Sequence, residues 1–394
     1  MWFDKFSLFL KKFSEMEKNY SLREFNTFGF DVKARYFQEL KTMDDIHDLI
    51  RNPEFIQCRD AIDRVSNGDA MNRISTGEKS CSGNKILILS GGSNILFSNE
   101  FYDGFVVYPN LKGVETLDEG DETVKIRCYC GEIWKDFVDY TVSRNLYGLE
   151  NLTDIPGKVG AAPVQNIGAY GAEVKDTIYQ VHTVDLMTGK IRVFNNDECE
   201  FSYRNSIFKQ SVGTHRVCPQ KSLPLIFAVD FILKKHCELK LDYGNIRNYL
   251  INNNITNPTI QDVASTVKAI RAEKLPEVGV VGSVGSFFQN AIVTMDKYLE
   301  IKALYPDAPS YPIDVRDAAR HIPAMVKIPS GWLIDRAGWK GHHENHVGVW
   351  DKQALVLVHY GGGKPQEILD LMKKIQKSVY NKFGIEIKPE VNIV

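Results

Sequence analysis

Two glycine-rich segments hold the residues of this chain that are best suited to chemistry. Residues 148–171 read GLENLTDIPGKVGAAPVQNIGAYG, with five glycines and two prolines among 24 residues, and residues 90–94 read SGGSN. Because glycine has no side chain, main-chain N–H groups in such segments can approach a flat or phosphorylated ligand closely. The glycines alone fit either a cofactor wall or a tight buried connection. The polar pair Gln165–Asn166, set among small apolar residues, favours the cofactor.

Motifs for several other chemistries are absent from the sequence. No G-x-G-x-x-G follows an expected strand and opens a helix, so a Rossmann dinucleotide site is not indicated. Gly361–Lys364 is followed by Pro365 and departs from the Walker pattern, and Ser283 lacks the first glycine of a nucleophile elbow. Residues 342–346, HHENH, lack the H-E-x-x-H order and stand between glycines, which favours solvated loop histidines over a metal site.

The composition is that of a folded protein with two or three domains. The 394 residues are 43% hydrophobic and 25% charged, with a net charge of −2, which excludes disorder and argues against a nucleic-acid partner. Seven cysteines without a C-x-x-C pair indicate a reduced cytoplasmic protein, in which Cys128 and Cys130 pack in a core. No apolar run is long enough to span a bilayer. Residues 3–13 place apolar side chains among lysines, which favours a packed or frayed extension over an interfacial helix or targeting segment.

The elements that must position the glycine-rich segments mix strands and helices without strict alternation, which indicates an α+β fold with more than one domain. Residues 51–85 show no sustained periodicity and are expected to form a surface insertion. The expected strands are Ile86–Leu89, Ile95–Phe97, Val124–Cys130, a hairpin of Val181–Leu186 with Ile191–Phe194, Leu225–Leu233, Ala354–Val358 and a closing strand from Ile385. The expected helices are Trp134–Val142, a capped helix from Thr259 to near Pro276, and Pro365 to Gly384.

Seven motifs together resemble those of the UDP-N-acetylenolpyruvoylglucosamine reductases. They are NTFG at 26–29, SGGSNILF at 90–97, GLENL with IPGKVGAAPVQNIGAYG at 148–171, YRNSIF at 203–208, GSFFQN at 285–290, GWLID at 331–335 and KPEV at 388–391. They occur in the family's order and cover the chain from about residue 20 to the C-terminus. The resemblance implies a cytoplasmic flavoenzyme that uses NADPH to reduce UDP-N-acetylglucosamine enolpyruvate to UDP-N-acetylmuramate for peptidoglycan.

In this family, FAD is held without a covalent bond by a domain resembling the vanillyl-alcohol oxidase flavin fold. The resemblance places Gly91, Gly92, Ser93 and Asn94 around the pyrophosphate, and Pro156, Gly157, Gly160, Ala161, Ala162, Ile167 and Gly168 along the flavin. NADPH and the sugar nucleotide would use one site in turn, which accounts for the missing Rossmann fingerprint. Neither glycine-rich segment holds a histidine, which argues against a covalent flavin oxidase of the same fold.

The family's reaction needs hydride at C3 of the enolpyruvyl group, stabilisation of the carbanion at C2, and a proton for C2. The resemblance assigns stabilisation to Arg204 and Glu390, and proton donation to Ser286. An arginine in a surface ion pair and a solvated terminal glutamate are the ordinary alternatives. The glycine before Ser286 and the two phenylalanines after it predict a constrained, partly dry setting. This intact set also argues against a catalytically silent sugar-nucleotide binder.

The resemblance also implies substrate contacts and a division into domains. Lys274 would bind the diphosphate, and its ordinary alternative is to complement a helix dipole together with Arg271. Tyr243 marks the subclass with a tyrosine loop. Further substrate positions of the family are matched by Tyr170, Asn290 and Gln353. Ala161 and Ala162 replace serines of some members, and Gln289 and Ala291 replace a lysine and a proline. We expect a monomer with an FAD part of 1–111 plus 385–394, a second FAD part of 112–275, and a substrate domain of 276–384 that closes to bring Ser286 to Arg204.

Overall fold

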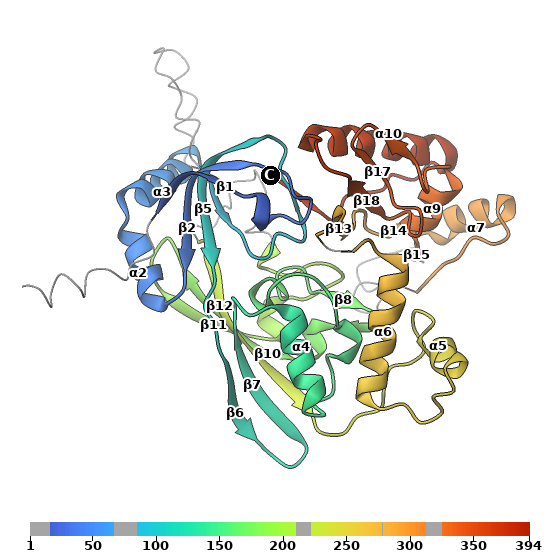
Figure 1. Ribbon diagram of the computed structural model, residues 1–394, viewed down its shortest axis with the longest axis horizontal. Coiled ribbons are helices and arrows are strands. Elements are labelled where there is room, and N and C mark those ends of the chain that lie inside the picture. Colours follow the sequence, from blue (N-terminus) through green and yellow to red (C-terminus); the bar gives the residue numbers. More distant parts are fainter. Residues whose placement is uncertain (1–15, 67–84, 210–221, 278, 313–324) are drawn as a thin grey trace, which may run out of the picture.

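The computed structural model describes residues 16–66, 85–209, 222–277, 279–312 and 325–394. Residues 1–15 and 67–84, which carry most of the N-terminal extension and half of the predicted insertion, lie outside this part. The described residues form three main sheets that follow one another along the chain. In Figure 1 the first sheet lies above the second, and the C-terminal sheet lies beside both. No helix in the described ranges is both long and apolar enough to cross a membrane.

The first sheet has the strand order β1-β2-β5-β3. Its strands are β1 (Glu17–Ser21), β2 (Lys33–Leu40), β3 (Ile86–Ile88) and β5 (Phe101–Pro109). β2, β5 and β3 are parallel, and β1 is an antiparallel edge strand. Helices α2 (Met43–Arg51) and α3 (Pro53–Ser66) lie beside the sheet, and the short strand β4 (Ile95–Leu96) follows the SGGSN turn. The predicted strand–turn–strand at 86–97 is therefore confirmed.

The prediction of a surface insertion is wrong for residues 53–66, which form α3. The side chain of Asn52 accepts a hydrogen bond from the Phe55 N–H at 3.0 Å, and Pro53 occupies the first turn. Phe55 and Cys58, one turn apart, are buried against the first sheet, where the Phe55 ring meets Phe105 edge-on at 5.3 Å. The apolar residues Phe55, Cys58, Ile62 and Val65 recur at helical spacing in the sequence, so the local pattern of a helix was present although residues 51–85 as a whole are polar.

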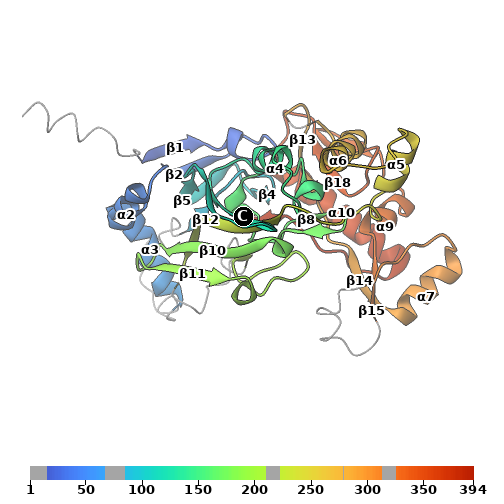
Figure 2. The same ribbon diagram turned by 90° about the horizontal axis from the view of Figure 1, so that it is seen from below.

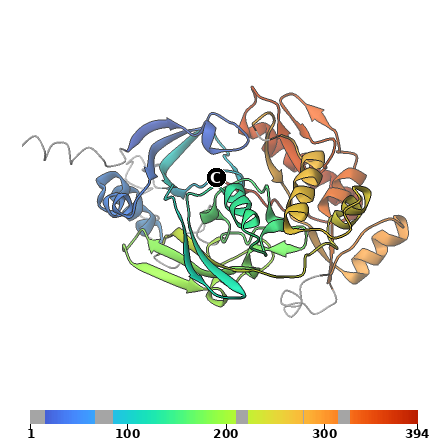
Figure 3. The ribbon, with the colours of Figure 1, turned by 60° about the horizontal axis from the view of Figure 1, so that its bottom comes forward.

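The second sheet is antiparallel with the order β11-β10-β12-β7-β6. Its strands are β6 (Val114–Glu119), β7 (Thr123–Tyr129), β10 (Ile178–Asp185), β11 (Ile191–Asn195) and β12 (Pro224–Lys234). Helices α4 (Trp134–Ser143) and α6 (Ile260–Lys274) lie side by side in Figure 3, joined by an ion pair of 2.6 Å between Lys268 and Asp139, and α5 (Ile246–Asn252) precedes α6. The predicted strands, hairpin and capped helix of this part are confirmed.

The third sheet has the order β13-β18-β17-β16 and is covered by α10 (Pro365–Phe383). Its strands are β13 (Gly282–Ser286), β16 (His343–Glu344), β17 (Val347–Val349) and β18 (Val356–His359). Helix α9 (Ser330–Arg336) packs on α10. Figure 2 shows the antiparallel pair of β14 (Ala291–Thr294) and β15 (Met325–Ile328) projecting outward with α7 (Met295–Leu304), which follows β14 in the chain. The predicted helix is confirmed, and Gly384 ends it with φ +66°.

The closing strand predicted from Ile385 is wrong. Residues 385–391 form no strand, and only β19 (Asn392–Ile393) pairs, in parallel, with β4. Pro389 has no N–H for a ladder and forms a single bridge with Phe288. The side chains of Ile385 and Ile387 are buried although the segment is irregular. The alternation of apolar residues here therefore reflects burial and does not indicate a strand.

The hydrophobic clusters cross the predicted domain boundaries. One cluster joins the first sheet to the C-terminal part, where the Phe28 and Phe287 rings lie 6.5 Å apart. Another joins Leu40 of the first sheet to Leu186 and Leu225 of the second. The α+β fold is confirmed, whereas the boundaries at 111 and 275 stay a prediction.

Gly92 packs directly against the main chain of Phe25, so substitution of this glycine tests the packing of the first glycine-rich turn. A Cβ there would lie 1.9 Å from Phe25 O at φ +61°, whereas Gly29, at φ +73°, has nothing within 4 Å of its Cβ position. We expect Gly92→Ala to lower the free energy of unfolding by at least about 3 kcal/mol and Gly29→Ala by about 1 kcal/mol. Urea unfolding of both variants measures this, and equal losses would contradict the packing described here.

Candidate active site

The C-terminal segment brings the three predicted catalytic residues together. β19 fixes Asn392 beside Ile95, directly after the SGGSN turn. Two residues earlier, the Glu390 N–H donates to Phe287 O at 2.8 Å, so Glu390 lies next to the strand that ends at Ser286. Figures 1 and 2 show the C-terminus between the first sheet and the C-terminal part.

Arg204 and Glu390 form a largely buried ion pair. Arg204 Nε lies 2.8 Å from Glu390 Oε1, and the two side chains are 20% and 11% exposed. Arg204 Nη2 also donates to Gly168 O at 2.8 Å, which ties the pair to the second glycine-rich segment. Burial lowers the pKa of Arg204, but the Glu390 carboxylate, with Tyr203 and Glu173, more than offsets this and holds the pKa above its usual value. The guanidinium therefore stays charged.

The main chain of Arg204 is strained. Ser202 and Asn205 exchange two N–H···O bonds of 3.1 Å, so Tyr203 and Arg204 form the tip of a tight hairpin. Arg204 has φ +55°, a left-handed conformation that costs a residue with a side chain about 1 kcal/mol or more. Tyr170 has φ +49° on the neighbouring segment. Glycine would relieve both strains, so these positions keep their side chains for another reason, and function is the hypothesis that fits.

Ser286 lies at the end of β13, opposite Val356 of β18, and its side chain is exposed. The partly dry setting predicted for it is therefore wrong. Phe287 and Phe288, which prompted that prediction, are fully buried. β13 ends at Ser286, and Gly285 before it has φ +70°, so the regular alternation of a strand stops here and both phenylalanines turn into the core while Ser286 does not. The hydroxyl is thus open to a ligand.

The two glycine-rich segments contact each other. A Cβ on Gly91 would lie 2.8 Å from Gly157 Cα, and Ser93 Oγ donates to Pro156 O at 2.9 Å. Asn94 donates to the Gln165 side chain and, at 3.4 Å, to Glu390 O. The segments predicted to bind one cofactor therefore form one continuous surface.

The SGGSN turn has main-chain N–H groups that are available to a ligand. Within the part of the chain described here, no main-chain N–H from Ser90 to Asn94 donates a hydrogen bond to another residue, and the buried Ser90 hydroxyl lacks a partner. Successive free N–H groups form a concave site that favours an anion. The turn therefore fits a pyrophosphate, as the FAD assignment requires.

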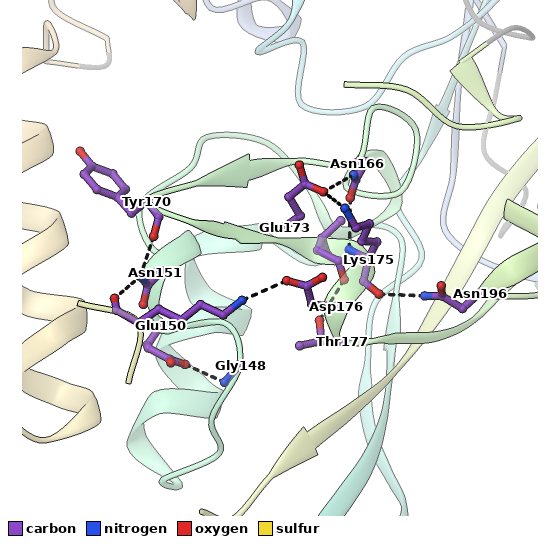
Figure 4. Close-up of polar contacts among 12 residues, drawn as sticks. Gly148, Glu150, Asn151, Asn166, Tyr170, Glu173, Lys175, Asp176, Thr177 and Asn196 are labelled. Carbon is purple, nitrogen blue, oxygen red and sulfur yellow. Dashed lines mark hydrogen bonds and ion pairs between the residues drawn. The ribbon is translucent and has the colours of Figure 1, made fainter. Parts of the chain in front are cut away.

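The second segment uses its polar residues for structure. Figure 4 shows Asn151 donating to Tyr170 O at 2.8 Å, and buried Asn166 donating to Glu173 at 3.0 Å. The hairpin of β8 (Gly168–Ala169) and β9 (Ala172–Glu173) is held in this way. The pair Gln165–Asn166 is thus explained by packing alone, and it no longer favours a cofactor as the sequence argument proposed.

The remaining predicted flavin contacts lie along this segment in two groups. Gly160 packs on Cys130: a Cβ added at Gly160 would lie only 2.5 Å from the Cβ of Cys130. Ala162 is buried in the core. Ala161, Ile167 and Gly168 remain partly exposed. The first group sets the position of the main chain, and the second leaves part of its surface uncovered.

The predicted substrate residues are only partly brought together. Tyr170 and Tyr243 interlock, since a Cβ on Gly244 would lie 2.4 Å from Tyr170 Cδ1 and one on Gly171 would lie 3.2 Å from Tyr243 Cβ. Asn290 follows Ser286 on the same segment, and its side chain accepts from the Ser330 N–H at 3.2 Å. Lys274, which is exposed, and Gln353, which is partly buried, make no hydrogen bond or ion pair with these residues in the described ranges.

Two basic groups of the site escaped sequence analysis. Arg271 was weighed only as a partner of a helix dipole, yet its side chain is 13% exposed, its nearest carboxylate, Asp154, is 3.9 Å away, and burial lowers its pKa. Lys209 donates to Arg204 O at 2.8 Å, and burial lowers its pKa. The sequence does not show that these two basic residues are buried, because their burial depends on parts of the chain that are distant in sequence.

Known proteins match this chain along its length. Residues 274–394 match the profile of the UDP-N-acetylenolpyruvoylglucosamine reductase C-terminal domain, and residues 79–195 match an FAD binding domain. A crystal structure of UDP-N-acetylenolpyruvylglucosamine reductase from Thermus caldophilus shares the fold, with a TM-score of 0.58 and 17% identity over 97% of this chain and 99% of that one.

Curated relatives are closer in sequence. The UDP-N-acetylenolpyruvoylglucosamine reductase of Bacteroides fragilis is 40% identical over 96% of this chain and 100% of its own length. Those of Flavobacterium johnsoniae and Pseudomonas putida are 37% identical over 96% of this chain and 100% and 99% of their own lengths. Since identity of this level covers whole relatives, the chain belongs to the UDP-N-acetylenolpyruvoylglucosamine reductase family.

Proposed function

We propose that this chain reduces UDP-N-acetylglucosamine enolpyruvate to UDP-N-acetylmuramate for peptidoglycan synthesis. The chain is an FAD-dependent oxidoreductase with NADPH as the hydride donor, as its family membership and its FAD binding domain require. A cytoplasmic location belongs to the proposal and is supported by the buried free thiols of Cys128, Cys130 and Cys199. The observation that carries the residue roles is the Arg204–Glu390 pair beside the strand of Ser286.

The two glycine-rich segments would hold FAD, which would supply a hydride for C3 of the enolpyruvyl group. Arg204 stabilises the negative charge that develops at C2 and on the adjoining carboxylate. The guanidinium is already held by its hydrogen bond to Gly168 O and by the charge of Glu390, so it needs little reorganisation when that charge appears. The left-handed turn fixes this orientation before substrate arrives.

Ser286 donates the proton that C2 requires. A hydroxyl is a weak acid, but a carbanion is a far stronger base, so a neutral serine suffices if it is placed next to C2. Exposure of Ser286 leaves its hydroxyl accessible, and the bond between Glu390 N–H and Phe287 O keeps it near the charged pair. Tyr170, Tyr243, Asn290, Lys274 and Gln353 are proposed to hold the sugar nucleotide, with closure of the 276–384 part bringing Ser286, Asn290 and Gln353 toward Arg204 and the residues of the 112–275 part.

Removing the Ser286 hydroxyl tests the proton transfer. We expect Ser286→Ala to lower kcat about 100-fold or more, while reduction of the bound flavin by NADPH keeps its wild-type rate. Stopped-flow absorbance measures the two half-reactions separately. Ser283→Ala, on the same strand, is the matched control and should turn over normally. Normal turnover of Ser286→Ala would overturn the assignment.

Neutralising Glu390 tests the ion pair. We expect Glu390→Gln to lower kcat more than it raises KM, because Arg204 loses the partner that orients it, and to cost about 2 kcal/mol of stability. Steady-state kinetics and urea unfolding measure the two effects. Glu386→Gln, an exposed change on the same segment, should alter neither. A folded Glu390→Gln enzyme with wild-type kcat would contradict the proposed role.

A further inference from the structure

Lys158 places a cation in the second glycine-rich segment, between Gly157 and Val159. Its Nζ donates to Asn110 Oδ1 at 2.7 Å and lies 4.0 Å from the centre of the Tyr108 ring. The residue is partly buried, its ammonium lies at the carboxyl end of β5, and within the described part of the chain it makes no hydrogen bond or ion pair with the Arg204–Glu390 pair that the proposed chemistry uses.

The charges around Lys158 leave it without a carboxylate of its own. Glu39 pairs with Lys41 at 3.0 Å and accepts from Asn110, and Glu132 pairs with Lys112 at 3.6 Å. Within the described ranges, no carboxylate lies within ion-pair distance of Lys158 Nζ. Burial, then Lys112, lowers the pKa of Lys158 to about 8, opposed only by Cys130, Glu39 and Glu132. A surplus positive charge therefore remains here.

This charge lies at the same sheet edge as the SGGSN turn. β3 and β5 are parallel, with Ile88 opposite Val107, so Ser90 and Tyr108 leave the sheet at neighbouring carboxyl ends. A Cβ on Gly91 would lie 3.5 Å from Lys158 N. The unpartnered N–H groups of residues 90–94 and the buried Ser90 hydroxyl lie at this edge too. A cation beside several free donors matches the chemistry of a diphosphate.

We propose that the Lys158 ammonium neutralises the pyrophosphate of FAD at the 90–94 turn. The inference rests on the proposed FAD-dependent function and adds a binding residue to it. Because an anion binds the protonated amine, affinity for FAD should be constant well below pH 8 and weaken by up to about tenfold per pH unit above it.

Binding of FAD to the apoprotein tests the proposal without any turnover. Quenching of FAD fluorescence gives Kd at pH 6.5, 7.5, 8.5 and 9.5 for wild type, Lys158→Met and Lys158→Arg, each shown to be folded by circular dichroism. We expect Lys158→Met to bind about 10- to 100-fold more weakly than wild type at pH 6.5, with no weakening from pH 6.5 to 9.5. Lys158→Arg should stay tight at pH 9.5, because arginine does not lose its proton.

Lys112→Met is the matched control, since Lys112 is an exposed lysine of the same cluster. It should bind FAD like wild type at pH 6.5 and begin to weaken at higher pH, because a repulsive charge has been removed. A folded Lys158→Met protein that binds FAD with wild-type affinity would overturn this inference but not the proposed function. A wild-type Kd for FAD that does not change from pH 6.5 to 9.5 would do the same. Failure of wild type to bind FAD at every pH would contradict the proposed function as well.

Discussion

The site depends on one requirement of electrostatics, namely that a buried charge needs a partner. Glu390 supplies that partner to Arg204 while its main chain is bonded to Phe287 and the residues after it pair with β4. One short segment thus joins the charged pair, the serine strand and the turn with free N–H groups. If the segment left its place, Arg204 would be buried without a counter-charge, so the end of the chain and the site are stabilised together.

Strain and rigidity complement each other around this pair. Arg204 and Tyr170 adopt left-handed conformations that favour glycine, and the hydrogen bonds of the surrounding hairpins keep them there. The side-chain NH2 groups of Asn151 and Asn166 donate to Tyr170 O and Glu173 and so support these hairpins. Among the described residues around the site, the N–H groups of residues 90–94 donate to no other residue, Lys158 has only the neutral Asn110 as hydrogen-bond partner, and Arg271 lies 3.9 Å from Asp154. These groups are all suited to anions. Both the proposed cofactor and the proposed substrate carry diphosphates.

Local patterns predicted the α+β class and most strands of the second sheet, but not β2 and β5 of the first sheet, and they predicted little of the site. The capping box at Thr259 and the glycine stop at Gly384 predicted their helices because both act within one turn. Helix α3 was missed because the polar composition of residues 51–85 as a whole favoured a surface insertion, although Phe55, Cys58, Ile62 and Val65 recur at helical spacing. The pairing of residues 204 and 390 follows from tertiary packing, so only the resemblance to a family could predict it, and the exposure of Ser286 depends on which way β13 turns its side chains.

An anaerobic spectral titration tests the central claim, that this surface binds a flavin able to pass hydride to an enol ether. The account predicts that purified protein absorbs near 450 nm, that one equivalent of NADPH removes this band, and that one equivalent of UDP-N-acetylglucosamine enolpyruvate restores it. Protein that takes up no FAD, or a reduced form that the enol ether does not reoxidise, would contradict it.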